Sequence, residues 1–265
     1  MKAFDLGQIH PTAILSDKAK IGRNVTMGAN VIVYDNVEIG DNVIIGPGSY
    51  IGEPAGNYYG NRNYSNPPLI IGANGLIRSG SIIYAGSFIG EKLECGHRVT
   101  IREDNRIGPH SRIGTLADIQ NGCQIGEYVR LHSGVFLAQK SIIGNYVWIF
   151  PHAVLTNDPH PPSNVAVGAI VEDFAVIAAG AVVLPGVKIG RDAMIGAMAL
   201  VRSDVPREAV MHGNPARQVA TIRDIKSKYM KEPPYPWREH FERSMPWEGI
   251  GYNEWLRGKE KANDF

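Results

Sequence analysis

A parallel β-helix is the fold class that this sequence predicts, on two observations. An apolar residue recurs at every sixth position, and the residue four positions later is mostly small or β-branched, as at Val25, Val43, Ser81 and Ala153. A period of six fits neither an α-helix nor a long alternating strand. It fits short strands joined by tight turns, with two inward-pointing residues in each group of six. Three such groups would make one triangular coil, and stacked coils would pair backbone to backbone.

The repeat falls into three blocks. The first block has its apolar positions at Ile9, Leu15, Ile21, Met27, Val33, Ile39, Ile45 and Ile51. The second runs unbroken through Ile71, Ile77, Ile83, Ile89, Cys95, Ile101, Ile107, Ile113, Ile119, Ile125, Leu131, Leu137, Ile143, Ile149 and Leu155. The third contains Val171, Ile177, Val183, Ile189, Ile195 and Val201. Glycine often follows the apolar residue directly, and we expect glycine and asparagine to serve the turns because they tolerate a positive φ.

Composition and charge exclude several classes of protein. The chain of 265 residues is 44% hydrophobic and 20% charged, with a net charge of +1. This balance gives no electrostatic reason to expect nucleic acid or an anionic membrane as a partner. The first residues lack the apolar core of a signal peptide, and no run of about 18 apolar residues occurs. We therefore expect a soluble, cytoplasmic protein in which Cys95 and Cys123 fill the core.

The hexapeptide pattern resembles the left-handed parallel β-helix of the hexapeptide-repeat acyltransferases over residues 9–217, and the handedness is implied by that resemblance alone. It implies an all-β acyltransferase domain over 1–217, followed by a tail over 218–265. Within the tail, residues 219–231 have the pattern of a short amphipathic helix, and the remainder is extended and rich in aromatic residues. We expect those aromatic side chains to pack on the flank of the prism or on a neighbouring subunit.

Two segments interrupt the repeat and are expected to form extruded loops. Residues 52–68 are polar, rich in glycine and asparagine, and carry Tyr58 and Tyr59. They are either a surface loop or one wall of a substrate cleft whose tyrosines stack on a ring. Residues 156–170 shift the register by four and contain His160. Many proteins of the family have a loop here that covers the active site, although a simple turn is the alternative.

Because eighteen residues complete one coil, residues that stack can be found from the sequence alone. Ile101 and Ile119 should stack, so Glu103 and Asp118 are expected within several ångströms of each other. Stacked polar residues on an outer face have an ordinary explanation as amide ladders. The concentration of polar groups is what favours a site, and its remaining members are Arg102, Gln120, Asn121, His132 and Asn157, which we assign to substrate binding.

The stretches GHRVTIRED, GTLADIQ and WIFPHAVLTNDPHPPS resemble the subgroup of this family that acylates the amino group of nucleotide-linked deoxyaminosugars. The resemblance implies that Glu103 and Asp118 lie near the sugar amine and that acetyl-CoA is the co-substrate, with no metal. It implies an N-acetyltransferase acting on a nucleotide-linked deoxyaminosugar, with dTDP as the expected nucleotide. Glu103 and Asp118 would position the amine and relay its proton. His97 is the rival general base because an unperturbed imidazole titrates near neutral pH.

CoA requires a long groove with cations for its phosphates. The stretch Gly213–Arg217 (GNPAR) resembles the closing motif of the family, near the CoA site. We therefore expect the last coils to hold CoA through Lys188, Arg202, Asn214 and Arg217. The resemblance also implies a homotrimer with active sites between subunits.

Three other functions remain open. A sugar O-acetyltransferase would depend on a histidine base, because a hydroxyl is a weaker nucleophile than an amine. A zinc enzyme of the carbonic anhydrase type shares the fold, but it needs three convergent histidines for each metal. A non-catalytic β-helix scaffold would require neither the GNPAR motif nor the polar cluster.

Overall fold

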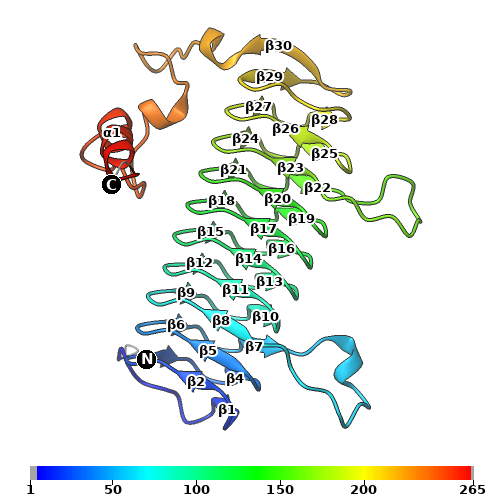
Figure 1. The fold of residues 1–265 in the computed structure, drawn as a ribbon, viewed down its shortest axis with the longest axis vertical. Coiled ribbons are helices and arrows are strands. Elements are labelled where there is room, and N and C mark those ends of the chain that lie inside the picture. The colour runs from blue at the N-terminus through cyan, green and yellow to red at the C-terminus, as the bar shows by residue number, and fades with distance from the viewer. Residues whose placement is uncertain (1–4, 264–265) are drawn as a thin grey trace.

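The chain winds into a long prism whose three sides are β-sheets (Figure 1). The structure is a computed structural model and describes residues 5–263. Within those residues the sheets contain ten, nine and eleven strands, and we call them the first, second and third sheets. From β1 to β28, consecutive strands occupy successive sides of the prism, as the six-residue period predicts.

The first sheet contains β1 (Ile14–Leu15), β4 (Ile32–Val33), β7 (Tyr50–Glu53), β10 (Ile82–Tyr84), β13 (Thr100–Ile101), β16 (Asp118–Ile119), β19 (Phe136–Leu137), β22 (Val154–Leu155), β25 (Val182–Val183) and β28 (Leu200–Val201). The second contains β2 (Lys20–Ile21), β5 (Val37–Ile39), β8 (Leu69–Ile71), β11 (Phe88–Ile89), β14 (Arg106–Ile107), β17 (Gln124–Ile125), β20 (Ile142–Ile143), β23 (Ile170–Val171) and β26 (Lys188–Ile189). The third contains β3 (Thr26–Met27), β6 (Ile44–Ile45), β9 (Leu76–Ile77), β12 (Glu94–Cys95), β15 (Arg112–Ile113), β18 (Arg130–Leu131), β21 (Trp148–Ile149), β24 (Val176–Ile177), β27 (Met194–Ile195), β29 (Ala209–His212) and β30 (Arg217–Thr221).

The register confirms that eighteen residues make one coil. Ile83 pairs with Ile101, and Ile101 pairs with Ile119. Across the two interruptions the paired residues are Ile39 with Ile71 and Ile143 with Val171. Those offsets are 71 − 39 = 32 and 171 − 143 = 28, so the loops extrude 32 − 18 = 14 and 28 − 18 = 10 extra residues. The prism therefore continues in register past both loops.

The interior is formed by the two positions that the repeat indicates. Ile101 and Ile119 are fully buried, and the second inward position is equally closed to solvent at Val43 and Ser81. The buried Ser81 hydroxyl donates to the carbonyl oxygen of Arg78 at 2.9 Å, so its polar group is satisfied. Both cysteines are buried and free, as expected of core residues.

The turns differ from the expectation in one respect. The residue with positive φ is the third after each apolar position, and it is asparagine in the early coils, as at Asn24 (φ 57°) and Asn42 (φ 59°). The glycine directly after the apolar residue has another role. A Cβ on Gly40 would lie 2.6 Å from the backbone nitrogen of Ala73, so this glycine allows two coils to approach closely.

The prediction of a helix over 219–231 is wrong. The chain from Arg217 to Thr221 forms β30, which pairs antiparallel with β29, and only a short 3₁₀ turn follows at Ile222–Asp224. The backbone groups on the free edge of β29 provide partners that a locally helical pattern does not reveal. Two further helical segments occur later, a 3₁₀ turn at Trp237–Glu239 and α1 (Tyr252–Asn263).

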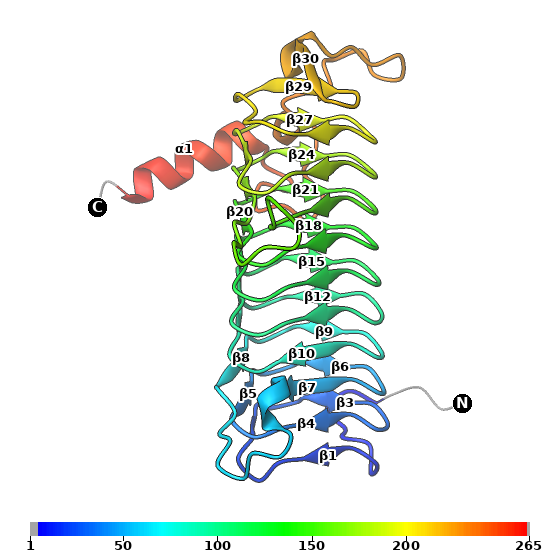
Figure 2. The same ribbon diagram turned by 90° about the vertical axis from the view of Figure 1, so that its right-hand side faces the viewer.

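The tail returns along the outside of the prism and packs on its flank, which is one of the two expected arrangements (Figure 2). Trp247 is fully buried against Tyr146 and Phe174, which lie at the turns between the second and third sheets. The tail therefore covers the corner between these sheets near the middle coils. No helix in residues 5–263 has the length and apolar character needed to cross a membrane.

Candidate functional site

Both loops leave the prism at the same corner, where the first sheet turns into the second. One follows β7 and the other follows β22, and both belong to the first sheet. Figure 1 shows the two loops projecting on the same side, opposite the tail. The first of them contains a short 3₁₀ turn at Gly56–Tyr58. The stretch of corner between these loops carries Glu103 and Asp118.

The structure brings Glu103 and Asp118 to neighbouring coils. Asp118 in β16 pairs with Thr100 in β13, and Glu103 follows the end of β13 by two residues. Glu103 accepts two hydrogen bonds from Arg102, from Nε to Oε2 at 2.8 Å and from Nη2 to Oε1 at 3.0 Å. The guanidinium of Arg102 also lies 4.8 Å from the centre of the Tyr84 ring. The Glu103 carboxylate is therefore held in one orientation at the corner.

Amide side chains continue this corner toward the second loop. Gln120 donates through Nε2 to Oδ1 of Asp118 at 2.9 Å. Asn157 donates to Oε1 of Gln139 at 3.4 Å, one coil further along. Asn121 is half-buried in the same column as Glu103 and Gln139. The substrate-binding residues expected at Arg102, Gln120, Asn121 and Asn157 thus lie along a single corner.

Each loop encloses a hollow against this corner. The loop at 52–68 forms one of about 340 Å³, whose lining includes Tyr64, Glu103 and Asp104. The loop at 156–170 forms another of about 360 Å³, whose lining includes Gln120 and Asn157. Both volumes suit a small ligand. Tyr64 is therefore the tyrosine of this loop that lines the hollow beside Glu103.

Tyr58 and Tyr59 lie further out on the first loop. Their rings meet edge to face with centroids 5.3 Å apart, and 44% and 70% of their surfaces are exposed. Neither lines the hollow beside Glu103. Stacking of these two rings on a substrate therefore remains a prediction.

His97 lies at a different corner, where the third sheet turns into the first. Its Nδ1 is 2.7 Å from the Ser79 hydroxyl, and its backbone N–H donates to Oγ1 of Thr115. His97 and Glu103 stand at opposite ends of β13. Within one chain they are not brought to one point.

His132 projects from the outer side of the third sheet. Its ring stacks on Phe150 with centroids 4.6 Å apart, and burial lowers the pKa of the imidazole below its ordinary value. His160 lies on the second loop, where its backbone N–H donates to Asp158. The first sheet lies between His132 and the Glu103 corner, whereas the loop that carries His160 leaves the prism at that corner.

The residues expected to bind CoA are spread over the last coils. Lys188 lies on the second sheet and forms an ion pair with Glu172 at 2.6 Å. Arg202 is exposed just after β28, at the corner between the first and second sheets. Asn214 and Arg217 lie at the connection between β29 and β30 in the third sheet. No single groove of the described chain gathers all four.

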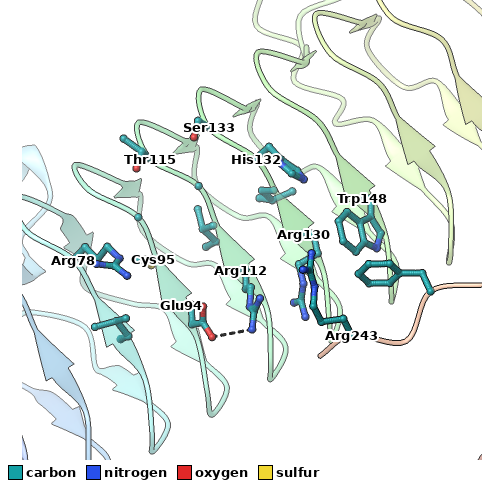
Figure 3. A pocket seen from close by; sticks show the side chains of 16 residues that line it. Arg78, Glu94, Cys95, Arg112, Thr115, Arg130, His132, Ser133, Trp148 and Arg243 are labelled. Atoms are coloured by element: carbon teal, nitrogen blue, oxygen red, sulfur yellow. Dashed lines mark ion pairs between the residues drawn. The ribbon is translucent and has the colours of Figure 1, made fainter. Parts of the chain in front are cut away.

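A further cleft lies on the third sheet, and the sequence analysis missed it. Figure 3 shows its side chains, which rise from β9, β12, β15, β18 and β21 and from the tail. The eighteen-residue step places Glu94, Arg112, Arg130 and Trp148 in one column, so part of this cleft could have been found from the sequence. Arg243 could not, because it comes from the tail. Among the described residues, no group of three His, Cys, Asp or Glu side chains is arranged to hold a metal ion.

Comparison with known proteins identifies the repeat. The family model described as "Bacterial transferase hexapeptide (six repeats)" matches residues 8–53 and 168–203. These stretches lie in the first and last blocks of the prism described above. The chain is similar to that family over those two stretches, which make up about a third of its length. The hexapeptide repeat thus builds the same kind of solenoid in this protein as its periodicity predicts.

One protein similar to part of this chain is a 2,3,4,5-tetrahydropyridine-2,6-dicarboxylate N-acetyltransferase of Staphylococcus aureus. It is 40% identical over 88 residues, which are 32% of this chain and 36% of the relative. The chain therefore matches only about a third of the length of its curated relatives.

Two solved structures share the fold. A UDP-N-acetylglucosamine acyltransferase from Campylobacter jejuni is 20% identical with a TM-score of 0.56, covering 84% of this chain and 79% of that one. An Arabidopsis UDP-N-acetylglucosamine acyltransferase is also 20% identical, with a TM-score of 0.59 and coverage of 81% and 74%. At this identity the likeness extends to the fold alone.

Proposed function

We propose that this protein is an acetyl-CoA-dependent N-acetyltransferase acting on the amino group of a nucleotide-linked deoxyaminosugar, such as a dTDP-linked one. The observation that carries the proposal is the corner between the two loops, where Glu103 and Asp118 lie on neighbouring coils beside two ligand-sized hollows. The N-acetyltransferase named among the relatives, and the hexapeptide repeats of bacterial transferases, support acyl transfer as the reaction.

The chemistry needs little from the protein beyond placement. The neutral amine attacks the thioester carbonyl, a C–N bond forms, and the C–S bond then breaks to release the thiol. The amine loses one proton, which a carboxylate can accept and pass to the leaving sulfur. Glu103 and Asp118 would hold the amine and carry that proton. The amide side chains of Gln120 and Asn157 would bind the hydroxyl groups of the sugar.

The assignment of Glu103 takes account of its ion pair. Arg102 neutralises much of the charge of Glu103, which suits an orienting role better than that of a strong base. Asp118 accepts from a neutral amide instead. We therefore propose Asp118 as the first proton acceptor and Glu103 as the residue that positions the amine.

The active site would be completed by a second copy of the chain in a homotrimer. The hollows described on a single prism are short, and CoA needs a long groove that two prisms packed side by side would create. Lys188, Arg202, Asn214 and Arg217 are proposed to contact CoA from such a groove. Sedimentation of the purified protein tests the trimer directly.

One observation favours a second candidate function. The Ser79 hydroxyl is within hydrogen-bonding distance of Nδ1 of His97, an arrangement that orients an imidazole as a general base. A histidine base is what transfer to a sugar hydroxyl would require. The alternative is therefore a sugar O-acetyltransferase that uses His97.

The test is incubation of the full chain with acetyl-CoA and a panel of dTDP- and UDP-linked aminosugars, with thiol release followed by a disulfide reagent. Mass spectrometry then places the acetyl group on nitrogen or oxygen. Release that depends on an amine supports the proposal. Release with simple sugar hydroxyls and none with amines would establish the alternative instead.

A further inference from the structure

The cleft on the outer side of the third sheet has a volume of about 420 Å³, within the range of small-molecule sites. It lies beside the tail, whereas Glu103 and the loops lie at the corner opposite this sheet (Figure 1). Figure 3 shows Arg78 at one end and Trp148 at the other. The cleft is thus separate from the site proposed above.

Positive charge dominates the lining. Four arginines, Arg78, Arg112, Arg130 and Arg243, face one carboxylate, Glu94. Glu94 pairs with Arg112 at 3.1 Å. Arg78 and Arg243 are exposed, and neither has an ion pair or a side-chain hydrogen bond with any other residue of the described chain. Two cations are therefore available for an anionic ligand.

Arg130 adds a cation that forms no ion pair with a carboxylate of the described residues. It is 6% exposed and donates to backbone carbonyls, to His110 at 2.6 Å and to Ser244 at 3.0 Å. Burial and then the nearby Arg112 lower the pKa of Arg130 to about 10, so it still carries its charge at neutral pH. A buried cation without an anionic partner makes the cleft attractive to anions.

The end of the cleft near the tail is aromatic. Trp148 and Phe241 meet edge to face at 5.3 Å, and His132 stacks on Phe150. The Trp148 Nε1 atom is buried and has no hydrogen-bond partner within the described residues. Because this donor is closed to solvent, a planar ring in the cleft would cover the aromatic faces rather than bond to Nε1.

The floor between these ends lacks side chains. Gly96 and Gly114 occupy the positions that Arg78 and His132 fill on the coils to either side. Arg78 and His132 are three strands apart, or roughly 14 Å at the usual strand spacing. The hydroxyls of Thr115 and Ser133 border the slot. Its length is that of a ring joined to two phosphates.

We propose that this cleft binds the nucleoside diphosphate part of a ligand, with the phosphates near Arg78 and Arg112 and the base against Trp148 and Phe241, beside Arg243. The identity of the ligand rests on the proposed function, because a nucleotide-linked sugar and CoA both carry such a group. Within one chain the cleft lies opposite Glu103, so a ligand bound here reaches a Glu103 only on a second copy.

The test is titration calorimetry of the full chain with UDP, dTDP, 3′,5′-ADP, CoA and inorganic pyrophosphate. We expect a nucleotide to bind at least tenfold more tightly than pyrophosphate. Arg78→Gln and Arg243→Gln should each weaken that binding at least tenfold. Arg106→Gln, which removes an exposed strand arginine from the second sheet, should leave it unchanged.

The ligands in this titration distinguish the two molecules that could supply the nucleoside diphosphate. Tighter binding of UDP or dTDP indicates the sugar nucleotide, and tighter binding of 3′,5′-ADP or CoA indicates the acyl donor. Equal affinity for pyrophosphate overturns the role of the aromatic wall, and no binding at millimolar concentration overturns the site. Suppose that the wild type binds no nucleotide and that the arginine variants change the molecular mass of the assembly measured by light scattering. This face would then be a contact between subunits and not a nucleotide site. If the protein binds a nucleotide but transfers no acyl group, the proposed function fails while the proposal for the cleft stands.

Discussion

Arg102 and Glu103 are neighbours in the sequence and form a two-point ion pair at the corner between the loops, with both N–O distances at or below 3.0 Å. Adjacent residues of a strand normally point to opposite faces. Here the strand ends at Ile101, and the turn that follows lets both side chains lie outside the prism. The turn therefore lets Arg102 hold the Glu103 carboxylate in place, which two adjacent residues within a strand could not do.

Replacement of the corner carboxylates tests the site. We expect Asp118→Asn to lower kcat/KM about 100-fold, the usual size of a lost proton acceptor, and Glu103→Gln to raise KM more than it lowers kcat. The matched control is Glu91→Gln, because Glu91 holds the same position in the turn after β11 at a different corner. Steady-state kinetics with the best aminosugar supply the readout. Full activity in a Glu103→Gln, Asp118→Asn double variant would remove both residues from the site.

The tail is attached to the prism through a buried ion pair. Arg238 pairs with Asp192, and their side chains are 12% and 1% exposed. Arg238→Met leaves this carboxylate buried with only Arg191 nearby, so we expect the free energy of unfolding to fall by about 3 kcal/mol. Urea denaturation measures it. Arg207→Met removes an exposed pair with Glu208 and should cost no more than about 1 kcal/mol. Equal losses in the two variants would contradict this account.

Trp247 should control the tail without controlling the prism. It is fully buried, and its Nε1 donates to the carbonyl oxygen of Phe241 at 2.9 Å. We expect Trp247→Ala to destabilise the protein by about 3–5 kcal/mol and to expose the tail to limited proteolysis, while the β-sheet signal in circular dichroism persists. Tyr229→Ala, at a residue that is 85% exposed, is the control. Cooperative loss of the whole sheet signal would show that the prism depends on the tail.

Stability should fall as the pH drops below neutrality, partly through His132. Burial lowers the pKa of its imidazole, so below the ordinary value of about 6.5 the unfolded chain binds the proton more readily than the folded one. Stability therefore rises with pH across the interval between the folded and unfolded pKa values and is level above it. His132→Phe keeps the stacking on Phe150 and should flatten the dependence between pH 5 and 7. Thermal unfolding at several pH values checks this, with His160→Gln on the exposed loop as the comparison.

The repeat made most of the fold predictable because each six residues encode one side of the prism. Stacking of Ile101 on Ile119, and hence the pairing of Thr100 with Asp118, follows from counting in eighteens. The same counting separates His97 from Glu103, because they lie six residues apart and so occupy successive corners. The prediction that His97 and Glu103 share one site considered only that they lie on neighbouring parts of one coil, and not that they occupy different corners of the prism.

The contacts made by the tail could not be predicted by counting in eighteens, because the tail lies outside the repeat. The strand at Arg217–Thr221 depends on the edge of β29, and its spacing of apolar residues also suits a helix. Arg243 reaches the third sheet only because Trp247 and its neighbours bury against Tyr146. Local pattern does not encode these long-range contacts, so neither the strand nor the arginine cleft was anticipated in full.

The antiparallel pairing of β30 also bears on how copies of this protein can associate. A stack of parallel coils ends in a row of unpaired backbone groups, which could template another stack and build a filament. On the third sheet β30 pairs with the outer edge of β29 and runs antiparallel to it, so the stack of parallel strands ends there. A second stack joining this edge could not continue the parallel register of the coils, which favours association through the flanks. A solenoid sealed in this way favours closed assemblies of side-by-side prisms over open fibres.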